Sequence, residues 1–253
     1  MRAQAGVRMA AAAMLLLWLE LLMAQVTAES ALQQQFAAVA TAFDADVQRT
    51  LRDVERLPRQ LLAARAYLRA GANLRGQWSW SEAQAAQFER SATRQQMLAD
   101  IKRLTALFES LNAGFTLYVN TEVRSLGVQL ERWNKNRTVG LLADELHAAA
   151  LAATNAGQPL RQFLIDWEPS AAAPLAAPGL GAHGRGQAVD FQIRNGERIV
   201  AGTETASVAN DWDAPGWTQK LQRAVERSGL PFRGPLLSPR EPWHYEYASA
   251  RTQ

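Results

Sequence analysis

The chain of 253 residues contains no cysteine and only three histidines. The lack of cysteine excludes disulfides, a thiol nucleophile and thiolate metal ligands. It does not assign a compartment, because exported proteins need not carry disulfides. With 27 basic and 24 acidic residues the chain has little excess charge. No basic run is interleaved with aromatic residues, so we expect no nucleic-acid partner.

The first 28 residues have the layout of a secretory signal. Arg2 and Arg8 precede an apolar stretch from about position 9 to position 23, and small residues follow up to Ala28. This order is typical of a signal peptide, and an uncleaved membrane anchor is the alternative. The stretch is short for a full membrane span, and Glu20 interrupts it. We therefore predict an exported protein of the periplasm or cell envelope, either processed or anchored in the inner membrane.

Residues 29–112 have a helical pattern. Apolar residues follow a seven-residue grid, that is, a repeat of seven positions. Phe36, Phe43 and Leu57 lie on one series of this repeat, and Val47 and Val54 lie on a second series. The grid predicts one helix over residues 31–57, which Pro58 ends or kinks. A second helix is expected over about 59–70. A third is expected to start at the capping box of Ser81 and Gln84 and to run to about Asn112. We interpret the apolar stripes as core, and self-association or partner binding through residues 31–112 is the alternative.

Residues 113–253 mix strands and helices. Alternation predicts a strand over 115–120, and "AVDFQI" and "ERIVAG" predict a β-hairpin with a type I′ turn at Asn195-Gly196. Helices are expected over about 124–136, 140–154 and 159–165, and again in "DAPGWTQKLQRAVERSG" before Gly229, followed by a short strand in "EPWHYEY". The predicted fold class is α+β, with a small antiparallel sheet and flanking helices, preceded by a helical N-terminal region. The expected domains are residues 29–112 and 113–253.

Two histidines and two acids lie in patterned surroundings. His183 and Asp190 are seven residues apart, and His244 follows Glu241 by three. Two imidazoles and a carboxylate form a three-ligand zinc site, and the open fourth position is typical of catalytic zinc. We therefore predict one Zn²⁺ per chain, bound by His183, Asp190 and His244. Glu241 is the candidate base that accepts a proton from a zinc-bound water.

The other histidine and the neighbouring glycines support this choice. His147 lies within a helical stretch, "ADELHAAA", and we interpret it as an ordinary polar residue rather than a ligand. Gly184 and Gly186 follow His183 closely. Glycine permits a positive φ and a close backbone approach, so this loop can wrap a metal ion.

Two stretches together resemble a known enzyme family. "PGLGAHGRGQAVD" (residues 178–190) and "EPWHYEY" (residues 241–247) are similar to the two motifs of the zinc D-alanyl-D-alanine carboxypeptidase and dipeptidase family. That family shares its fold with the Hedgehog signalling domain. The resemblance implies that His183, Asp190 and His244 bind zinc and that Glu241 is the catalytic base. Gly181 stands where the family has a serine.

A third stretch extends the resemblance, which covers about residues 113–250. "VNTEVRSLGVQ" is similar to a strand and the following arginine motif of the family, with Val123 in place of an aromatic residue. The resemblance implies that Arg124 steadies the substrate carbonyl oxygen as negative charge develops on it.

The expected function is zinc-dependent hydrolysis of peptidoglycan stem peptides next to D-alanine, of the D,D-carboxypeptidase type. Peptidoglycan peptides are therefore the expected partners. An endopeptidase that cuts cross-links is the alternative within enzymes, because the depth of the pocket beyond the scissile bond decides between them. A non-catalytic, membrane-tethered envelope module that binds partners through its helices is the alternative from another class.

Overall fold

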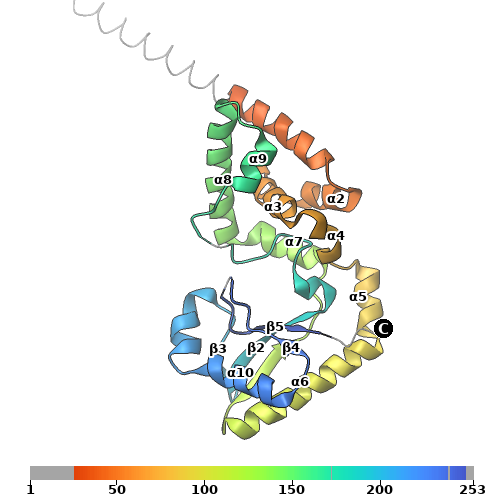
Figure 1. The fold of residues 1–253 in the computed structure, drawn as a ribbon, viewed down its shortest axis with the longest axis vertical. Coiled ribbons are helices and arrows are strands. Elements are labelled where there is room, and N and C mark those ends of the chain that lie inside the picture. Colours follow the sequence, from red (N-terminus) through yellow and green to blue (C-terminus); the bar gives the residue numbers. More distant parts are fainter. Residues whose placement is uncertain (1–25, 172, 239, 249–253) are drawn as a thin grey trace, which may run out of the picture. The chain divides into compact units, whose positions relative to one another are not determined.

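The computed structural model describes residues 26–171, 173–238 and 240–248. Most of the predicted signal or anchor, residues 1–25, therefore lies outside the described residues. Ala28 is buried within a helix over residues 26–41. Among the described residues, no helix combines the length and the apolar character needed to cross a membrane. The described residues divide into two compact units, one within 26–71 and 136–171 and the other within 72–135 and 173–248 (Figure 1).

The first unit is helical in its described part. It contains the helix over residues 26–41, followed by α2 (Ala45–Asp53), α3 (Leu57–Ala70), α8 (Arg137–Asn155) and α9 (Leu160–Asp166). Helix α3 packs against both α8 and α9. Residues of the seven-residue grid pack in the interior of this unit, since Phe36, Val47 and Val54 are buried. Those three side chains are therefore not available for self-association.

The single helix predicted over residues 31–57 is wrong, because the chain breaks twice. The first helix ends at Thr41, and the Asp44 side chain caps α2 by accepting a hydrogen bond from the Val47 backbone at 3.1 Å. The second break lies at Arg56, which has a φ of 66°. Pro58 does not end a helix but lies in the first turn of α3, where the missing backbone N–H costs nothing.

The second unit contains a five-stranded antiparallel sheet in its described residues. Its elements are α4 (Leu74–Gln77), α5 (Glu82–Glu89), α6 (Ala92–Leu111), β1 (Thr116–Asn120), α7 (Leu126–Lys135), η2 (Ala182–Arg185), β2 (Ala188–Asn195), β3 (Arg198–Ala201), η4 (Val208–Asp213), α10 (Trp217–Ser228), β4 (Phe232–Arg233) and β5 (His244–Tyr247). The strand order is β1-β2-β5-β4, and β3 also pairs with β2. The predicted α+β class with a small antiparallel sheet is confirmed.

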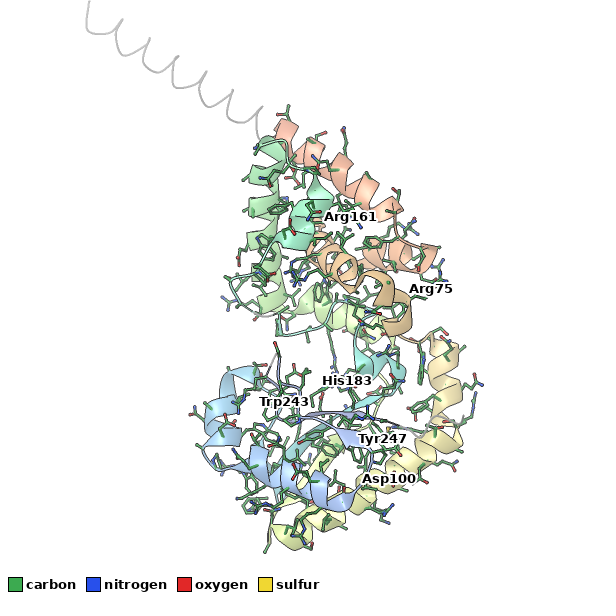
Figure 2. All side chains as sticks on the ribbon, in the orientation of Figure 1. Arg75, Asp100, Arg161, His183, Trp243 and Tyr247 are labelled. Carbon is green, nitrogen blue, oxygen red and sulfur yellow. The ribbon has the colours of Figure 1, made fainter. Side chains whose placement is uncertain are left out.

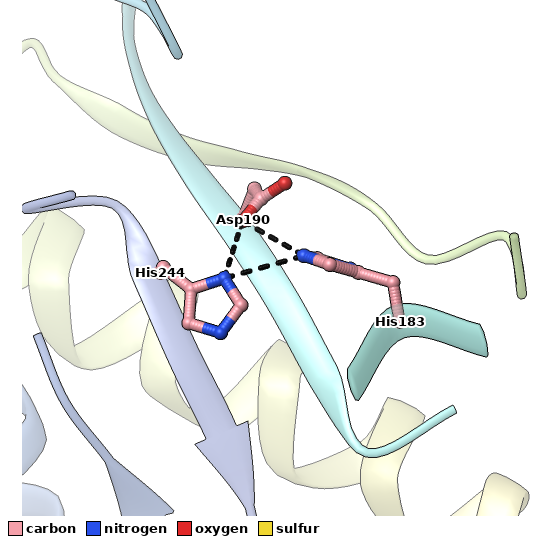
Figure 3. Close-up of side chains that lie close together, drawn as sticks. All are labelled: His183, Asp190 and His244. Atoms are coloured by element: carbon pink, nitrogen blue, oxygen red, sulfur yellow. Dashed lines mark hydrogen bonds and ion pairs between the residues drawn. The ribbon is translucent and has the colours of Figure 1, made fainter. Parts of the chain in front are cut away.

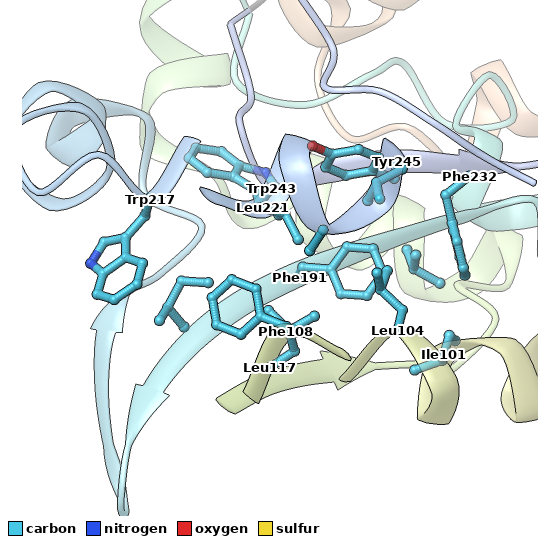
Figure 4. Close-up of a cluster of buried hydrophobic side chains, with 14 of the residues drawn as sticks. Ile101, Leu104, Phe108, Leu117, Phe191, Trp217, Leu221, Phe232, Trp243 and Tyr245 are labelled. Carbon is cyan, nitrogen blue, oxygen red and sulfur yellow. The ribbon is translucent and has the colours of Figure 1, made fainter. Parts of the chain in front are cut away.

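Helices α6 and α10 cover one face of this sheet. Leu104 and Phe108 of α6 and Leu221 of α10 pack against Phe191 of β2 and Tyr245 of β5 in a single hydrophobic core (Figure 4). Successive residues of a strand point to opposite faces. Because Phe191 and Tyr245 point into the core, their neighbours Asp190 and His244 point to the face away from α6 and α10.

The two units do not coincide with the expected domains 29–112 and 113–253. Helices α5 and α6 belong to the sheet unit, since Met97 and Phe108 of α6 are part of its core. A hydrogen bond of 2.7 Å from the Tyr247 hydroxyl to the buried Asp100 also ties α6 to β5 (Figure 2). Helices α8 and α9 belong instead to the helical unit. Helical periodicity predicts helices but not the surface on which each one packs.

Two local predictions in the sheet unit are wrong in detail. The expected helix from Ser81 to Asn112 is divided into α5 and α6, because Ser91 caps a new helix by accepting a hydrogen bond from the Arg94 backbone. In the hairpin, Asn195 pairs with Arg198, so Gly196 and Glu197 form the turn. A type I′ turn needs a positive φ at both central residues. Gly196 has one and Glu197 does not.

Candidate metal centre

Strand register brings two of the predicted ligands together. In the antiparallel pairing of β2 with β5, Asp190 lies directly opposite His244. Opposite residues of such a pair have Cβ atoms about 4.5–5.5 Å apart. A slip of one residue would turn both side chains to the other face. The apolar residues on either side of each ligand, which are held in the core, therefore also fix the ligand pair.

The third predicted ligand comes from the short helix η2, which precedes β2. Three atoms form a nearly equilateral triangle, His183 Nε2, Asp190 Oδ1 and His244 Nδ1, with separations of 3.2, 3.2 and 3.3 Å (Figure 3). All three side chains are mostly buried, with exposed fractions of 11–12%. This group could hold a metal ion.

The dimensions of the triangle fit a small cation. Tetrahedral zinc with nitrogen and oxygen ligands at about 2.0–2.1 Å places the ligand atoms about 3.3–3.4 Å apart, close to the observed separations. Hydrogen bonds among the three side chains account for the triangle less well than a bound cation does. Each imidazole nitrogen carries at most one hydrogen and the ionised carboxylate oxygen carries none. Hydrogen atoms can therefore occupy at most two of the three edges, whereas one cation contacts all three atoms.

The protonation states also fit metal binding. Burial raises the pKa of Asp190, but hydrogen bonds from His183 and His244 and the charge of Arg124 outweigh it, so the pKa lies far below its usual value. Burial lowers the pKa of His183 despite the opposing contact with Asp190. The carboxylate is therefore ionised and the His183 imidazole is neutral at pH 7, and these are the forms that bind metals.

Arg124 holds the other oxygen of the Asp190 carboxylate. Its Nη2 donates to Asp190 Oδ2 at 2.5 Å, while Oδ1 faces the two histidines. The Arg124 backbone also donates to the His183 carbonyl at 3.3 Å. Partners of this kind orient a metal ligand and commonly affect metal affinity by about 10–100-fold. Arg124 therefore has a structural contact that the sequence did not predict, in addition to its predicted role towards substrate.

Glu241 lies beside the triangle without being part of it. Its Oε2 is 3.7 Å from His244 Nδ1, and 19% of its side chain is exposed. Its backbone N–H donates to the Leu236 carbonyl at 2.9 Å, and the His244 N–H donates to the Glu241 carbonyl at 3.1 Å. These bonds fix Glu241 relative to His244. Burial, assisted by the charge of Asp190 and opposed by His244 and Arg124, raises the pKa of Glu241.

Both predicted catalytic side chains and all three predicted ligands line one cavity of about 470 Å³. One wall consists of small and apolar residues of the proline- and alanine-rich loop, at Ala173, Pro174, Leu175, Ala176 and Leu180. Thr203, Thr205 and Trp243 line other parts of it, and Arg132 adds a second cation. Sequence reasoning assigned no role to these four residues. Trp243 lies within the second motif beside His244, whereas Thr203, Thr205 and Arg132 lie outside the two main motifs.

A small hydrogen-bonded network supports the loop that carries His183. The Ser79 N–H donates to the Gly179 carbonyl at 2.8 Å, and the Trp80 N–H donates to the Gly184 carbonyl at 2.9 Å. The Gln129 side chain accepts from the Gly179 N–H at 3.0 Å and donates to the Ser79 hydroxyl at 2.9 Å. Gln129 belongs to the arginine motif, but nothing in the sequence indicates its link to Ser79.

The glycines near His183 are required for packing. A Cβ atom on Gly184 would lie 2.1 Å from the Ser79 hydroxyl oxygen, and Gly186 has a φ of 59° with Phe88 packed against it. The predicted close approach is therefore confirmed at both glycines and the predicted positive φ at Gly186 alone, and the close contacts are with Ser79 and Phe88. At Gly181 the nearest atom to a Cβ would be Gln129 Oε1 at 3.6 Å, so a serine would fit there.

His147, which was not assigned as a ligand, lies in the helical unit and contacts Glu29 at 3.2 Å.

Comparison with known proteins identifies no relative, since no protein-family model, curated protein or solved structure matches the chain.

Proposed function

We propose that this chain is a zinc-dependent peptidase of the Hedgehog/D,D-peptidase fold that hydrolyses peptidoglycan stem-peptide bonds next to D-alanine. The observation that carries the proposal is the His183–Asp190–His244 triangle, with Glu241 held beside it in the same cavity. Three protein ligands leave one position open, which a structural zinc site does not need. The exported location and the D,D-carboxypeptidase type rest on the sequence patterns described above.

Each residue of the cavity has a role in this proposal. A bound zinc ion would supply a Lewis acid that acidifies water and polarises the scissile carbonyl. Glu241 accepts the proton of the attacking water at its carboxylate and returns it to the departing amine. Arg124 orients Asp190 and presents a cation towards the developing oxyanion. The alanine- and proline-rich wall accommodates the methyl side chain of an alanine residue.

The decisive experiment is mass spectrometry of peptidoglycan fragments after incubation with the purified protein, with and without a zinc chelator. Chelator-sensitive loss of a single alanine would support the carboxypeptidase, and split cross-links would replace it with an endopeptidase. No change with folded, zinc-loaded protein would refute the peptidase and favour a non-catalytic module.

A variant of Glu241 tests the assignment of the base. Glu241→Gln should retain zinc and lose about 10²–10⁴-fold in turnover, because the amide cannot accept the proton. Glu197→Gln, in the exposed hairpin turn, is the matched control and should leave turnover unchanged. A fully active Glu241→Gln protein would exclude Glu241 as the base.

A further inference from the structure

A second cavity is lined by the residues that follow His183 in the same loop. Its volume is about 400 Å³, and Arg185, Gly186 and Gln187 line it, whereas Gly181, Ala182 and His183 line the metal cavity. Gln187 follows His183 by four positions, so their Cα atoms lie within about 14 Å of each other. The two cavities therefore belong to one region of the sheet unit.

Aromatic rings form part of the second cavity. The rings of Trp80 and Phe88 have centroids 4.9 Å apart with planes tilted by 56°, and both side chains are only partly buried. Phe88 is held by Gly186, which packs against its ring, and by Arg94, whose guanidinium carbon lies 5.9 Å from the ring centroid. The ring position is thus fixed without a ligand.

The polar part of the lining is almost entirely neutral. It combines the side-chain amides of Gln84, Gln87 and Gln187 with the hydroxyls of Ser91 and Thr93. Tyr247 also lines the cavity, and its hydroxyl donates to Asp100. In the part of the chain that the structure describes, no acidic residue lines this cavity, and Arg185 is the one cation. Arg185 is itself tied to the chain, since its Nη1 donates to the Gly76 carbonyl.

The amides leave hydrogen-bonding capacity for a ligand. Gln84 uses its side-chain oxygen in the capping box with Ser81, at 2.9 Å, so its Nε2 remains a donor. The side-chain amides of Gln87 and Gln187 have no hydrogen-bond partner among the described residues. An amide offers both donors and acceptors, which matches hydroxyl and acetamido groups.

We propose that this cavity binds a neutral oligosaccharide. Aromatic faces carry partial negative charge and attract the polarised C–H groups of a sugar ring, while neutral amides and hydroxyls bind its polar groups. A metal ion would need carboxylates, and a polyphosphate would need more than one cation. A polymer that carries both sugars and peptides could contact both cavities. This joint use of the two cavities rests on the proposed peptidase function, whereas the sugar site itself does not.

The test is titration of the purified protein with the N-acetylglucosamine tetramer, followed by intrinsic tryptophan fluorescence and by calorimetry. Trp80→Ala should weaken binding by roughly tenfold, the upper range for a single aromatic contact. Gln87→Ala should also weaken binding, and because Gln87 is exposed this substitution removes no buried contact. Gln219→Ala, an exposed glutamine on α10, is the matched control and should bind as the wild type does.

Two results would overturn the oligosaccharide site. One is the absence of tetramer binding by folded wild-type protein, including the case in which an alanine-rich peptide binds here instead. The other is tetramer binding that Trp80→Ala and Gln87→Ala both leave unchanged. The titration is repeated with Glu241→Gln, which should bind the tetramer normally. Failure of the peptidase and failure of the sugar site are therefore distinguishable.

Discussion

Zinc should stabilise this protein through His183, and the size of the effect can be estimated. The metal binds only the folded arrangement, in which strand register and η2 bring the three ligand atoms within 3.3 Å of one another. At a free zinc concentration about a thousandfold above Kd, the stabilisation is about 4 kcal/mol. For a protein of this size, 1 kcal/mol corresponds to roughly 2–4 °C in Tm. The transition of the sheet unit should therefore rise by roughly 8–16 °C.

Differential scanning calorimetry with zinc and with chelator measures this shift. His183→Ala leaves two ligands, and we expect it to lose most of the zinc-dependent increase. His147→Ala is the matched control, because His147 lies in the helical unit and contacts Glu29. It should retain the full increase. Melting in chelator shows whether each variant folds.

The refuting result is an equal zinc-dependent increase in wild type and in folded His183→Ala. The stabilising zinc would then bind elsewhere, and the triangle would not be the metal centre. Loss of the increase in His147→Ala would refute the reasoning as well, since that histidine belongs to the helical unit and is not one of the three ligands.

Three further predictions follow from contacts around the site. Arg124→Met should weaken zinc affinity by about 10–100-fold, because Asp190 loses the donor on Oδ2; a fall in kcat at unchanged zinc affinity would show that Arg124 acts on substrate alone. Gly184→Ala should lower the free energy of unfolding by about 1–3 kcal/mol through overpacking, whereas Gly181→Ser should cost little; denaturant titration that ranks them in the opposite order would contradict the packing argument. Because the folded-state pKa of Glu241 is raised, metal-free protein should lose stability as pH rises from the unfolded to the folded pKa. In chelator, Glu241→Gln should therefore be more stable than wild type at pH 7. This advantage should vanish at a pH below both the folded-state and the unfolded-state pKa of Glu241. A stability difference that does not change with pH would refute the link between the Glu241 pKa and stability.

The sequence identified the residues that meet at the candidate site better than it identified their surroundings. His183 and His244 are two of only three histidines in the chain, and Asp190 and Glu241 lie seven and three residues from them, so the identity and spacing of these residues were informative. The role of Arg124 towards Asp190 was not predictable, because it depends on a contact across 66 positions of the chain. The same holds for Ser79 and Gln129, which meet only in the folded unit.

Some helix boundaries were predicted from the sequence and others were missed. The capping box at Ser81 was predicted from adjacent residues and is present. The breaks at Asp44 and Ser91 were missed, because apolar periodicity continued through them and outweighed a single capping residue. Pro58 was assigned to the wrong end of a helix, since proline is compatible with a first turn as well as with a termination.

By itself, the sequence determined the α+β class, the hairpin and the set of residues able to bind a metal, because these depend on local alternation, turn residues and side-chain chemistry. Only the tertiary structure decided which helices pack on the sheet, since an apolar stripe specifies burial but not the surface that buries it. It also decided that Asp190 faces His244, because a core of non-local contacts sets the register between β2 and β5. The group of residues that could hold a metal ion forms only through that register.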